Sequence, residues 1–378
     1  MKKKYIIFSI VTLVLLVSFL SYSKYLKTTN VCKEDVKPTK ITKGISMNLE
    51  QTAGAGDYKQ VTQSNWPTEG YKFNTELSRC ENGSTLSWDD SKKAVVMNGN
   101  VSDKCYVYFD KVLTLANYVI SQYTGIQGEN SLYYHDSNLA NGVGDNSYRY
   151  AGASDSVNNY ICLGSDAATC PDDNLFRIIG VFGAQTKVIR AKSVGNQKWD
   201  TSSSNKWSSS SLNRYLNGTY LTSLGTLKNK IATTTRKVGG GTPANISEVV
   251  PATAYKNEVG SSASRTIVNK KIGLMYVTDY YYSASPSAWT LVGYNSSDTT
   301  KDYRVAKTIN WLYLGSYEWT ISCHSGTSYS AFGVGNLGYV SGYFDVSTSS
   351  AVRPTFNLES SVKYVSGSGS MSDPVRVN

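Results

Sequence analysis

The feature that most constrains this chain is an uninterrupted apolar stretch near its N-terminus. Residues 5–22 contain no charged residue, glycine or proline, and Lys2, Lys3 and Lys4 stand directly before them. These 18 residues would rise roughly 27 Å as a helix, which is enough to cross a thin bilayer. We therefore predict a single transmembrane helix over residues 5–22.

The three lysines also predict the orientation of this helix, because positively charged flanks stay on the cytoplasmic side. Residues 1–4 would be cytoplasmic and the bulk of the chain extracellular, so the predicted location is the cell membrane. A cleaved signal peptide is the alternative, and it requires a cleavage site built from small residues. Ser21, Tyr22 and Ser23 fit that pattern poorly.

The net charge of +10 is concentrated around the apolar stretch. Nine lysines against Glu34 and Asp35 give residues 1–43 a net charge of +7, which leaves +3 for residues 44–378. A basic surface for nucleic acid is therefore not indicated, and we expect no nucleic-acid partner. The chain also holds 29 Tyr, 9 Phe and 7 Trp, which excludes disorder for most of its length.

The six cysteines agree with an oxidising, extracellular location. Two pairs are close in sequence and flank turns, and we expect them to form the disulfides Cys80–Cys105 and Cys162–Cys170. Zinc binding is the alternative, but the chain has no Cys-x-x-Cys motif and only two histidines. The state of Cys32 and Cys323 stays open: they could pair with each other, pair with a partner chain, or remain thiols.

Composition and periodicity divide the rest of the chain. The polar residues 23–43 are typical of a stalk, and residues 44–112 alternate in the manner of a small, mostly β domain that a disulfide would staple. Residues 113–125 carry apolar side chains at helical spacing and predict a linking helix. The larger domain would then span residues 126–378.

Within the larger domain we expect a β-hairpin, one helix and several short strands. The hairpin joins residues 174–182 to residues 186–192. The helix starts at the serines of residues 208–211 and ends near Asn217-Gly218. Short strands are expected in the apolar or alternating segments 271–283, 317–323, 330–336, 338–344 and 351–358.

Three motifs follow one another in this domain: Trp207, Ser210, Ser211, Leu212, Tyr215, Leu216 and Asn217; then Trp319 to Ser322; then Val352, Arg353 and Pro354. In this order they resemble a bacterial domain of unknown function found in surface and secreted proteins, and residues 44–112 resemble the small module that precedes it. That family looks related to the C-type-lectin-like fold, which formylglycine-generating enzymes share. The resemblance implies an α+β domain with a twisted antiparallel sheet over residues 126–378, and it implies no activity.

Few residues favour catalysis or metal binding. Cys323 and His324 are adjacent on a predicted strand, so they would point to opposite faces, which is poor geometry for a catalytic dyad. No metal ligands or cofactor are predicted. Calcium is kept as an alternative because oxygen-bearing side chains cluster in loops, although solvated turns are the commoner explanation; these side chains are Asp136, Asp145, Asn146, Asp166, Asp172 and Asp173.

Aromatic residues are the clearest indication of function. We expect Trp207, Trp311 and Trp319 to fill the core, and Arg353 to hold a loop through backbone carbonyls. The rings that stand beside serine and glycine turns are predicted to lie on the surface and bind a ligand: Trp289, Tyr294, Tyr329, Tyr339 and Tyr343.

The sequence therefore favours a membrane-anchored extracellular binding or adhesion protein that recognises a glycan or a protein, rather than an enzyme. Two alternatives stay open. One is a secreted or wall-associated enzyme that acts on a polymer, and the other is a structural subunit of the cell surface.

Overall fold

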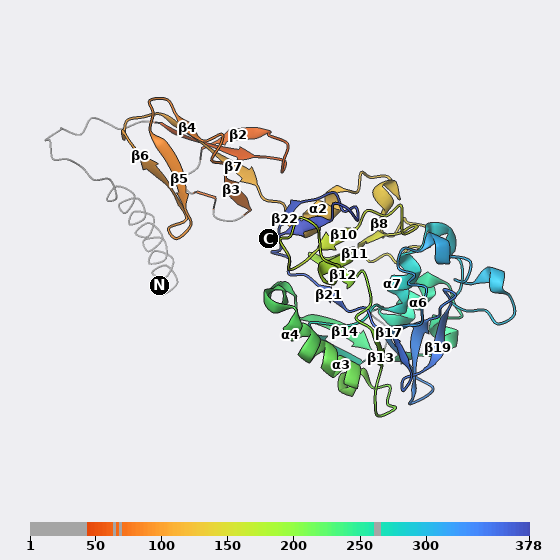
Figure 1. Cartoon of the computed structure of the whole chain (residues 1–378). Coiled ribbons are helices and arrows are strands. Elements are labelled where there is room, and N and C mark those ends of the chain that lie inside the picture. The colour runs from red at the N-terminus through yellow and green to blue at the C-terminus, as the bar shows by residue number, and fades with distance from the viewer. Residues whose placement is uncertain (1–43, 63–65, 68–69, 261–265) are drawn as a thin grey trace, which may run out of the picture. The chain divides into compact units, whose positions relative to one another are not determined.

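The computed structural model describes residues 44–62, 66–67, 70–260 and 266–378. Two compact units result: the first holds residues 44–49, 58–66 and 73–109, and the second holds residues 110–378 with residues 50–57 and 67–72 (Figure 1). The predicted cytoplasmic residues, anchor and stalk lie outside the described residues. In the described ranges no helix combines the length and the apolar character that a bilayer crossing requires.

The first unit is built of strands, as predicted. Its main sheet has the order β2-β1-β7-β3, with β4 also paired to β7, and a separate hairpin joins β5 to β6. The strands are β1 (Ile45–Glu50), β2 (Tyr58–Val61), β3 (Tyr71–Phe73), β4 (Arg79–Cys80), β5 (Thr85–Asp89), β6 (Ala94–Asn98) and β7 (Cys105–Lys111). Alternation in β7 buries Cys105, Val107 and Phe109 on one face.

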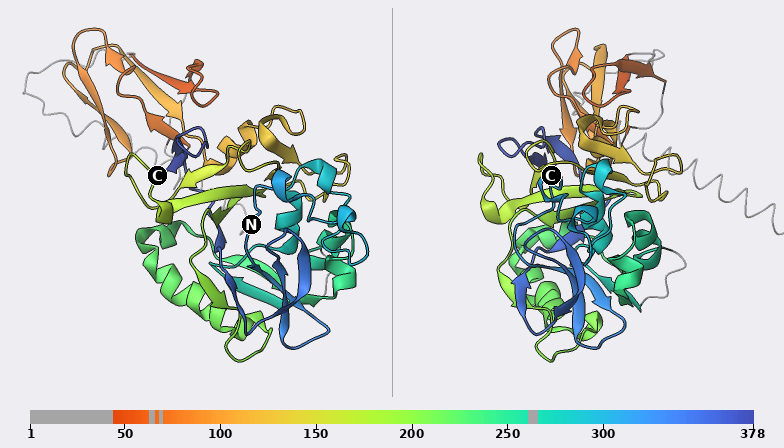
Figure 2. Two further views of the ribbon diagram at one scale, coloured as in Figure 1. Left: turned by 45° about the vertical axis from the view of Figure 1, so that its right-hand side comes forward. Right: turned by 90° about the vertical axis from the view of Figure 1, so that its right-hand side faces the viewer.

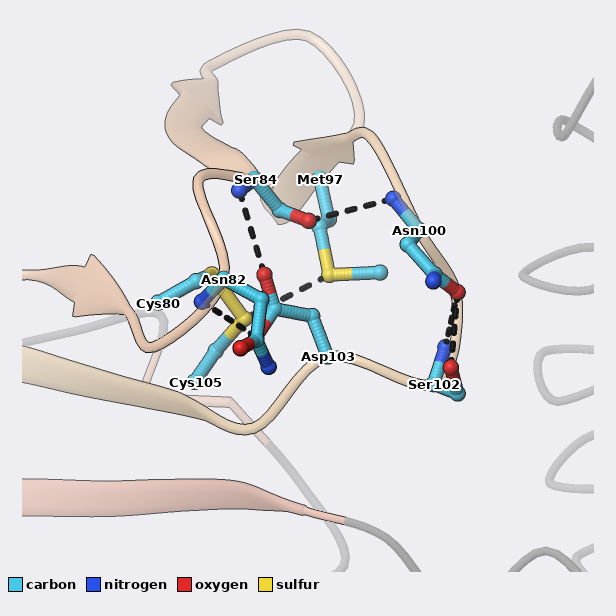
Figure 3. Close-up of a disulfide and its surroundings, with 8 residues drawn as sticks. All are labelled: Cys80, Asn82, Ser84, Met97, Asn100, Ser102, Asp103 and Cys105. Atoms are coloured by element: carbon cyan, nitrogen blue, oxygen red, sulfur yellow. Dashed lines mark hydrogen bonds between the residues drawn. A yellow bond between two sulfur atoms is a disulfide. The ribbon is translucent and has the colours of Figure 1, made fainter.

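The Cys80–Cys105 disulfide, which the sequence predicted, joins two residues that lie opposite each other in β4 and β7. The turn beside it is fixed by the buried carboxylate of Asp103, which accepts hydrogen bonds from the backbone N–H groups of Asn82 (2.9 Å) and Ser84 (3.1 Å) (Figure 3). The thioether of Met97 lies 3.5 Å from the sulfur of Cys105. The disulfide therefore packs against the β5–β6 hairpin. A unit of this size has a small core, so this contact is an important part of it.

The second unit contains two larger sheets and a two-stranded ribbon. The larger sheet has the order β21-β12-β11-β10-β23-β22, with β9 paired to β11 and β8 to β9. Its strands are β8 (Leu132–Tyr134), β9 (Tyr148–Tyr150), β10 (Tyr160–Cys162), β11 (Leu175–Phe182), β12 (Gln185–Arg190), β21 (Thr355–Asn357), β22 (Tyr364–Ser366) and β23 (Val375–Val377).

The other sheet has the order β13-β20-β17-β18-β19, with β15 paired to β17. Its strands are β13 (Asn196–Lys198), β15 (Gly240–Gly241), β17 (Glu318–His324), β18 (Ser330–Val334), β19 (Val340–Asp345) and β20 (Ser349–Ala351), and the ribbon pairs β14 (Thr234–Val238) with β16 (Thr266–Lys270). Both sheets are mainly antiparallel but include parallel pairs, such as β10 with β23 and β17 with β20. The unit is thus a mixed α+β domain that is mostly sheet.

Short helices pack around these sheets: α2 (Leu115–Ser121), α3 (Ser211–Tyr215), α4 (Leu221–Ser223), α5 (Pro243–Ile246), α6 (Pro251–Glu258) and α7 (Val277–Tyr282). The predicted linking helix corresponds to α2. Figure 2 shows α3 and α4 in green along one edge of the unit, and the blue strands β17 to β19 beside the teal helices α6 and α7.

The predicted hairpin is confirmed as β11 and β12, and it forms the centre of the larger sheet. Seven of the eight residues of β11 are buried, as expected for an apolar strand covered on both faces. Gly180 is required where β9 crosses closely, because a Cβ atom there would lie 2.1 Å from the carbonyl oxygen of Tyr148.

Two local predictions were wrong. Residues 277–282 form helix α7 instead of a strand, because Asp279 accepts the N–H of Tyr276 (2.7 Å) and Glu258 accepts that of Val277 (2.9 Å) at its first turn. The helix that begins after Ser210 does not end at Asn217-Gly218. It continues through a π-helical turn to Ser223, because the Asn217 side chain is held by the backbone of Ile272.

Candidate ligand-binding surface

The candidate site lies on β19 and on the segments that flank β17, β18 and β19. All residues of β17 and β18 are buried, whereas β19 alternates between buried and exposed positions. Of these three strands only β19 therefore presents side chains to solvent, and it stands at the edge of its sheet.

Four rings form one continuous group, which we call the aromatic strip: Tyr294, Tyr317, Tyr339 and Phe344. The ring centroids are 5.6 Å apart for Tyr294 and Tyr339, 6.5 Å for Tyr339 and Phe344, and 5.6 Å for Phe344 and Tyr317. Tyr317 is 46% exposed and the other three are half-buried. Such spacings are favourable for aromatic pairs, so the strip is a pre-formed surface.

Glycines explain why these rings lie close to the sheet. A Cβ atom on Gly333 would lie 2.1 Å from the Phe344 ring, and one on Gly335 would lie 2.4 Å from the Tyr339 ring. The N–H of Gly335 also donates to the carbonyl of Tyr339 (2.8 Å). The Gly-Val-Gly sequence of residues 333–335 is therefore the floor on which the strip rests.

A positive charge borders the strip at Tyr294. The guanidinium of Arg304 lies 5.1 Å from the centre of the Tyr294 ring, within range of a cation–π contact. It is positioned by the fully buried carboxylate of Asp302 and by the carbonyl of Asn295 (2.6 Å). Hydrogen bonding to Asp302 raises the pKa of Arg304, which remains charged.

Tyr343 and Tyr329 are exposed, at 66% and 53%. The pairing of β18 with β19 shifts so that Gly342 and Tyr343 together face Phe332, which is a β-bulge. Tyr343 then lies 5.2 Å from the ring of His324. Burial lowers the pKa of His324, and its Nδ1 accepts the N–H of Gly326 (2.8 Å).

The structure places the predicted ligand-binding residues unequally. It brings Tyr294 and Tyr339 into ring contact, and it exposes Tyr329 and Tyr343. The prediction that Trp289 is a surface residue was wrong, since only 1% of it is exposed.

Trp289 is buried because polar and aromatic partners enclose it. Its indole N–H donates to the carbonyl of Ala284 (2.9 Å), and its ring packs against Tyr133, His135 and Tyr282 at 5.2–5.3 Å. Trp289 follows a turn rich in serine and alanine, and these small neighbours were the reason to expect an exposed ring. At this position small neighbours in the sequence do not indicate exposure.

Sequence reasoning missed Tyr317, Phe344 and Arg304. The available signal was Gly333 in β18 and Gly335 just after it, since glycine on a strand often marks a place where a large ring packs over the backbone. The expected core positions of Trp207, Trp311 and Trp319 are confirmed, with at most 2% exposure each.

Two buried ion pairs, Glu318 with Arg353 and Asp279 with Lys187, are bonded internally. Arg353 donates to both oxygens of Glu318 (2.7 Å each) and to the carbonyl of Leu312 (2.5 Å), which confirms that it holds a loop. Lys187 pairs with Asp279 at 2.5 Å. Both pairs have ordinary structural roles.

Glu258 is also buried, and burial raises its pKa. It accepts the N–H groups of Val277 and Thr278 (2.9 Å each) and bonds the Ser322 hydroxyl. Its contacts are those of a helix cap. Cys323 is 8% exposed on β17, and Cys32 lies outside the described residues, so their state stays open.

Three of the carboxylates considered for calcium form ion pairs within the protein. Asp145 pairs with Arg149 (2.6 Å), Asp172 with Lys192 (2.5 Å), and Asp173 with Arg190. Over the described ranges no three His, Cys, Asp or Glu side chains gather as metal ligands would. The second predicted disulfide, Cys162–Cys170, is present and closes its short loop.

Comparison with known proteins gives one match. Residues 184–360, which include the whole aromatic strip, are similar to a family described as Domain of unknown function (DUF6273). No curated protein and no solved structure matches the chain.

Proposed function

We propose that this chain is a membrane-anchored extracellular binding protein that recognises a glycan or a protein ligand. The larger domain, proposed here to be C-type-lectin-like, would present the binding surface. The small β domain and the stalk would hold it away from the membrane.

The observation that carries the proposal is the aromatic strip. Tyr residues offer large contact areas at low conformational cost, and aromatic and arginine side chains dominate binding energy at protein surfaces. The strip combines these with Arg304 and rests on glycines that fix its rings. The two disulfides support an oxidising, extracellular location.

The test is ligand capture by the full-length chain in polyoxyethylene detergent micelles, on a glycan array and on intact cells. Tyr317→Ala should reduce capture about tenfold, because hot-spot rings contribute roughly 1–2 kcal/mol. Leu337→Ala is the matched control, since Leu337 is 50% exposed and lies outside the strip. Tyr329→Ala and Tyr343→Ala show whether the neighbouring rings contribute.

The proposal is wrong if Tyr317→Ala binds as well as the control to every ligand found. Thermal unfolding distinguishes lost binding from lost folding: a half-exposed ring should change the melting temperature little. A buried ring truncated to Ala would instead cost roughly 3–5 kcal/mol of unfolding free energy.

A further inference from the structure

A pocket lies elsewhere in the second unit, beside the Cys162–Cys170 loop, and has a volume of about 640 Å³. This is within the range of small-molecule sites, which is about 300–1,000 Å³. Three segments surround it: the stapled loop, the turn that contains Lys230, and the C-terminal strands β22 and β23. None of the strip residues lines it, so it is a separate site.

The walls of the pocket are held in place by covalent and hydrogen bonds. The disulfide closes the loop, and the Arg376 guanidinium donates to the carbonyls of Ser165 and Ala168 (3.1 Å each). Asp373 is fixed as well, because its carboxylate accepts the N–H of Ser368 (2.8 Å). A site with pre-set walls loses little entropy when it binds.

Both signs of charge line the pocket. Lys230 and Arg376 supply two cations, and in the described chain neither has a carboxylate within ion-pairing distance. Two carboxylates, Asp166 and Asp373, face the same space. Arg376 has five N–H donors and the two carbonyls use only part of them.

This chemistry selects a class of ligand. The two carboxylates disfavour a polyanion, and the two cations disfavour a polyamine. Hydroxyl groups are present on Ser165, Thr226, Ser366 and Ser372, but no aromatic ring lines the pocket on which a sugar could stack. From these observations we infer that the pocket binds a zwitterion, namely a short peptide with a free ammonium and a free carboxylate.

The roles of the side chains follow from charge. The ligand carboxylate is bound by Lys230 and Arg376, and its ammonium by Asp166 and Asp373. The inference does not depend on the proposed function of the aromatic strip.

The test is a ligand-observed NMR titration of the full-length chain, in polyoxyethylene micelles, with tri-alanine as the probe. Tri-alanine should bind saturably in the millimolar range. Its N-acetylated and C-amidated forms should each bind roughly fivefold more weakly, because each lacks one charge. No saturable binding of tri-alanine, or equal binding of the blocked forms, overturns the inference.

Two pairs of variants locate the site. Lys230→Gln and Asp166→Asn should each weaken binding roughly fivefold. Their controls are Lys228→Gln and Asp155→Asn, which change exposed residues outside the pocket and should bind within about twofold. If the pocket variants and the controls behave alike, the peptide does not bind in this pocket. Tyr317→Ala should leave tri-alanine binding unchanged. The proposal for this pocket and the proposal for the aromatic strip can therefore be refuted independently.

Discussion

At the scale of single residues, the buried pair Glu318 and Arg353 is the clearest determinant of stability. Glu318 is 1% and Arg353 is 3% exposed at the side chain. Glu318→Gln would leave the Arg353 charge buried without its partner, and we expect a loss of about 3–5 kcal/mol of unfolding free energy. The exposed pair Asp172 and Lys192 is the control, and Asp172→Asn should cost less than about 1 kcal/mol. Calorimetric melting of both variants tests this, and similar costs would contradict it.

His135 provides a pH-dependent test at the same scale. Burial lowers its pKa well below the usual value; nearby Arg149 lowers it further and Asp145 opposes this. The folded state thus holds His135 neutral, whereas the unfolded state takes up a proton near pH 6.5. Above pH 6.5 His135 is neutral in both states, so its burial costs no stability. As the pH falls from 6.5 toward the lower pKa of the folded state, stability is lost, because only the unfolded state gains a proton.

His135→Phe removes this titration, and Phe suits a site enclosed by the Tyr282 and Trp289 rings. Below pH 6.5 the unfolding free energy of the native chain should fall relative to that of the variant, by up to about 1.4 kcal/mol per pH unit, and its melting temperature should fall with it. Glu258 and Glu318 have raised pKa values in the folded state, so their protonation stabilises the fold as the pH falls. This opposite effect is the same in the native chain and in the variant. Parallel pH profiles would show that His135 is not the group responsible.

At the scale of elements, the two disulfides should have unequal importance. In the chain-entropy description, closing the 25-residue separation of Cys80–Cys105 stabilises by about 3.5 kcal/mol, and the 8-residue separation of Cys162–Cys170 by about 2.5 kcal/mol. The first belongs to a unit with a small core, so Cys80→Ala with Cys105→Ala should make that unit sensitive to protease. Cys162→Ala with Cys170→Ala should leave the second unit resistant. Limited proteolysis with mass spectrometry decides this, and equal resistance of both variants would contradict it.

The elements that the sequence predicted correctly are those whose structure depends on residues within the same segment. The hairpin of β11 and β12 combines a buried apolar run with a turn at Gly183, whose φ of +61° favours glycine. Helix α7 was missed because three consecutive tyrosines are typical of strands, while the carboxylate of Glu258 that caps it comes from another helix. Its packing, like the burial of Trp289, depends on contacts between distant segments, which a single sequence does not display.

The candidate site was predictable in part for the same reason. Aromatic density and small neighbouring residues indicated the region, and the structure shows Tyr294 and Tyr339 in contact there. Tyr317 packs against Phe344, whose ring lies over Gly333. That juxtaposition is a property of strand register, and a one-residue shift would move Phe344 to the other face.

At the scale of the whole molecule, the proposed topology places residues 1–4 inside the cell and residues 23–378 outside. The prediction depends on Lys2, Lys3 and Lys4, since lysines beside an apolar segment resist translocation. In intact cells that express the chain with a tag at each end, added protease should remove the C-terminal tag. A short fragment with the N-terminal tag should survive until the cells are permeabilised.

Replacing all three lysines by Gln should weaken this orientation, so that part of the chain keeps its C-terminal tag in intact cells. Replacing Lys24, Lys27 and Lys33 by Gln removes the same charge from the far side of residues 5–22, and it should preserve or strengthen the orientation. Full protection of residues 44–378 in the native chain would overturn the topology and, with it, an extracellular ligand. A mature chain that lacks residues 1–22 would instead identify a cleaved signal peptide, which leaves the binding domains outside but without this anchor.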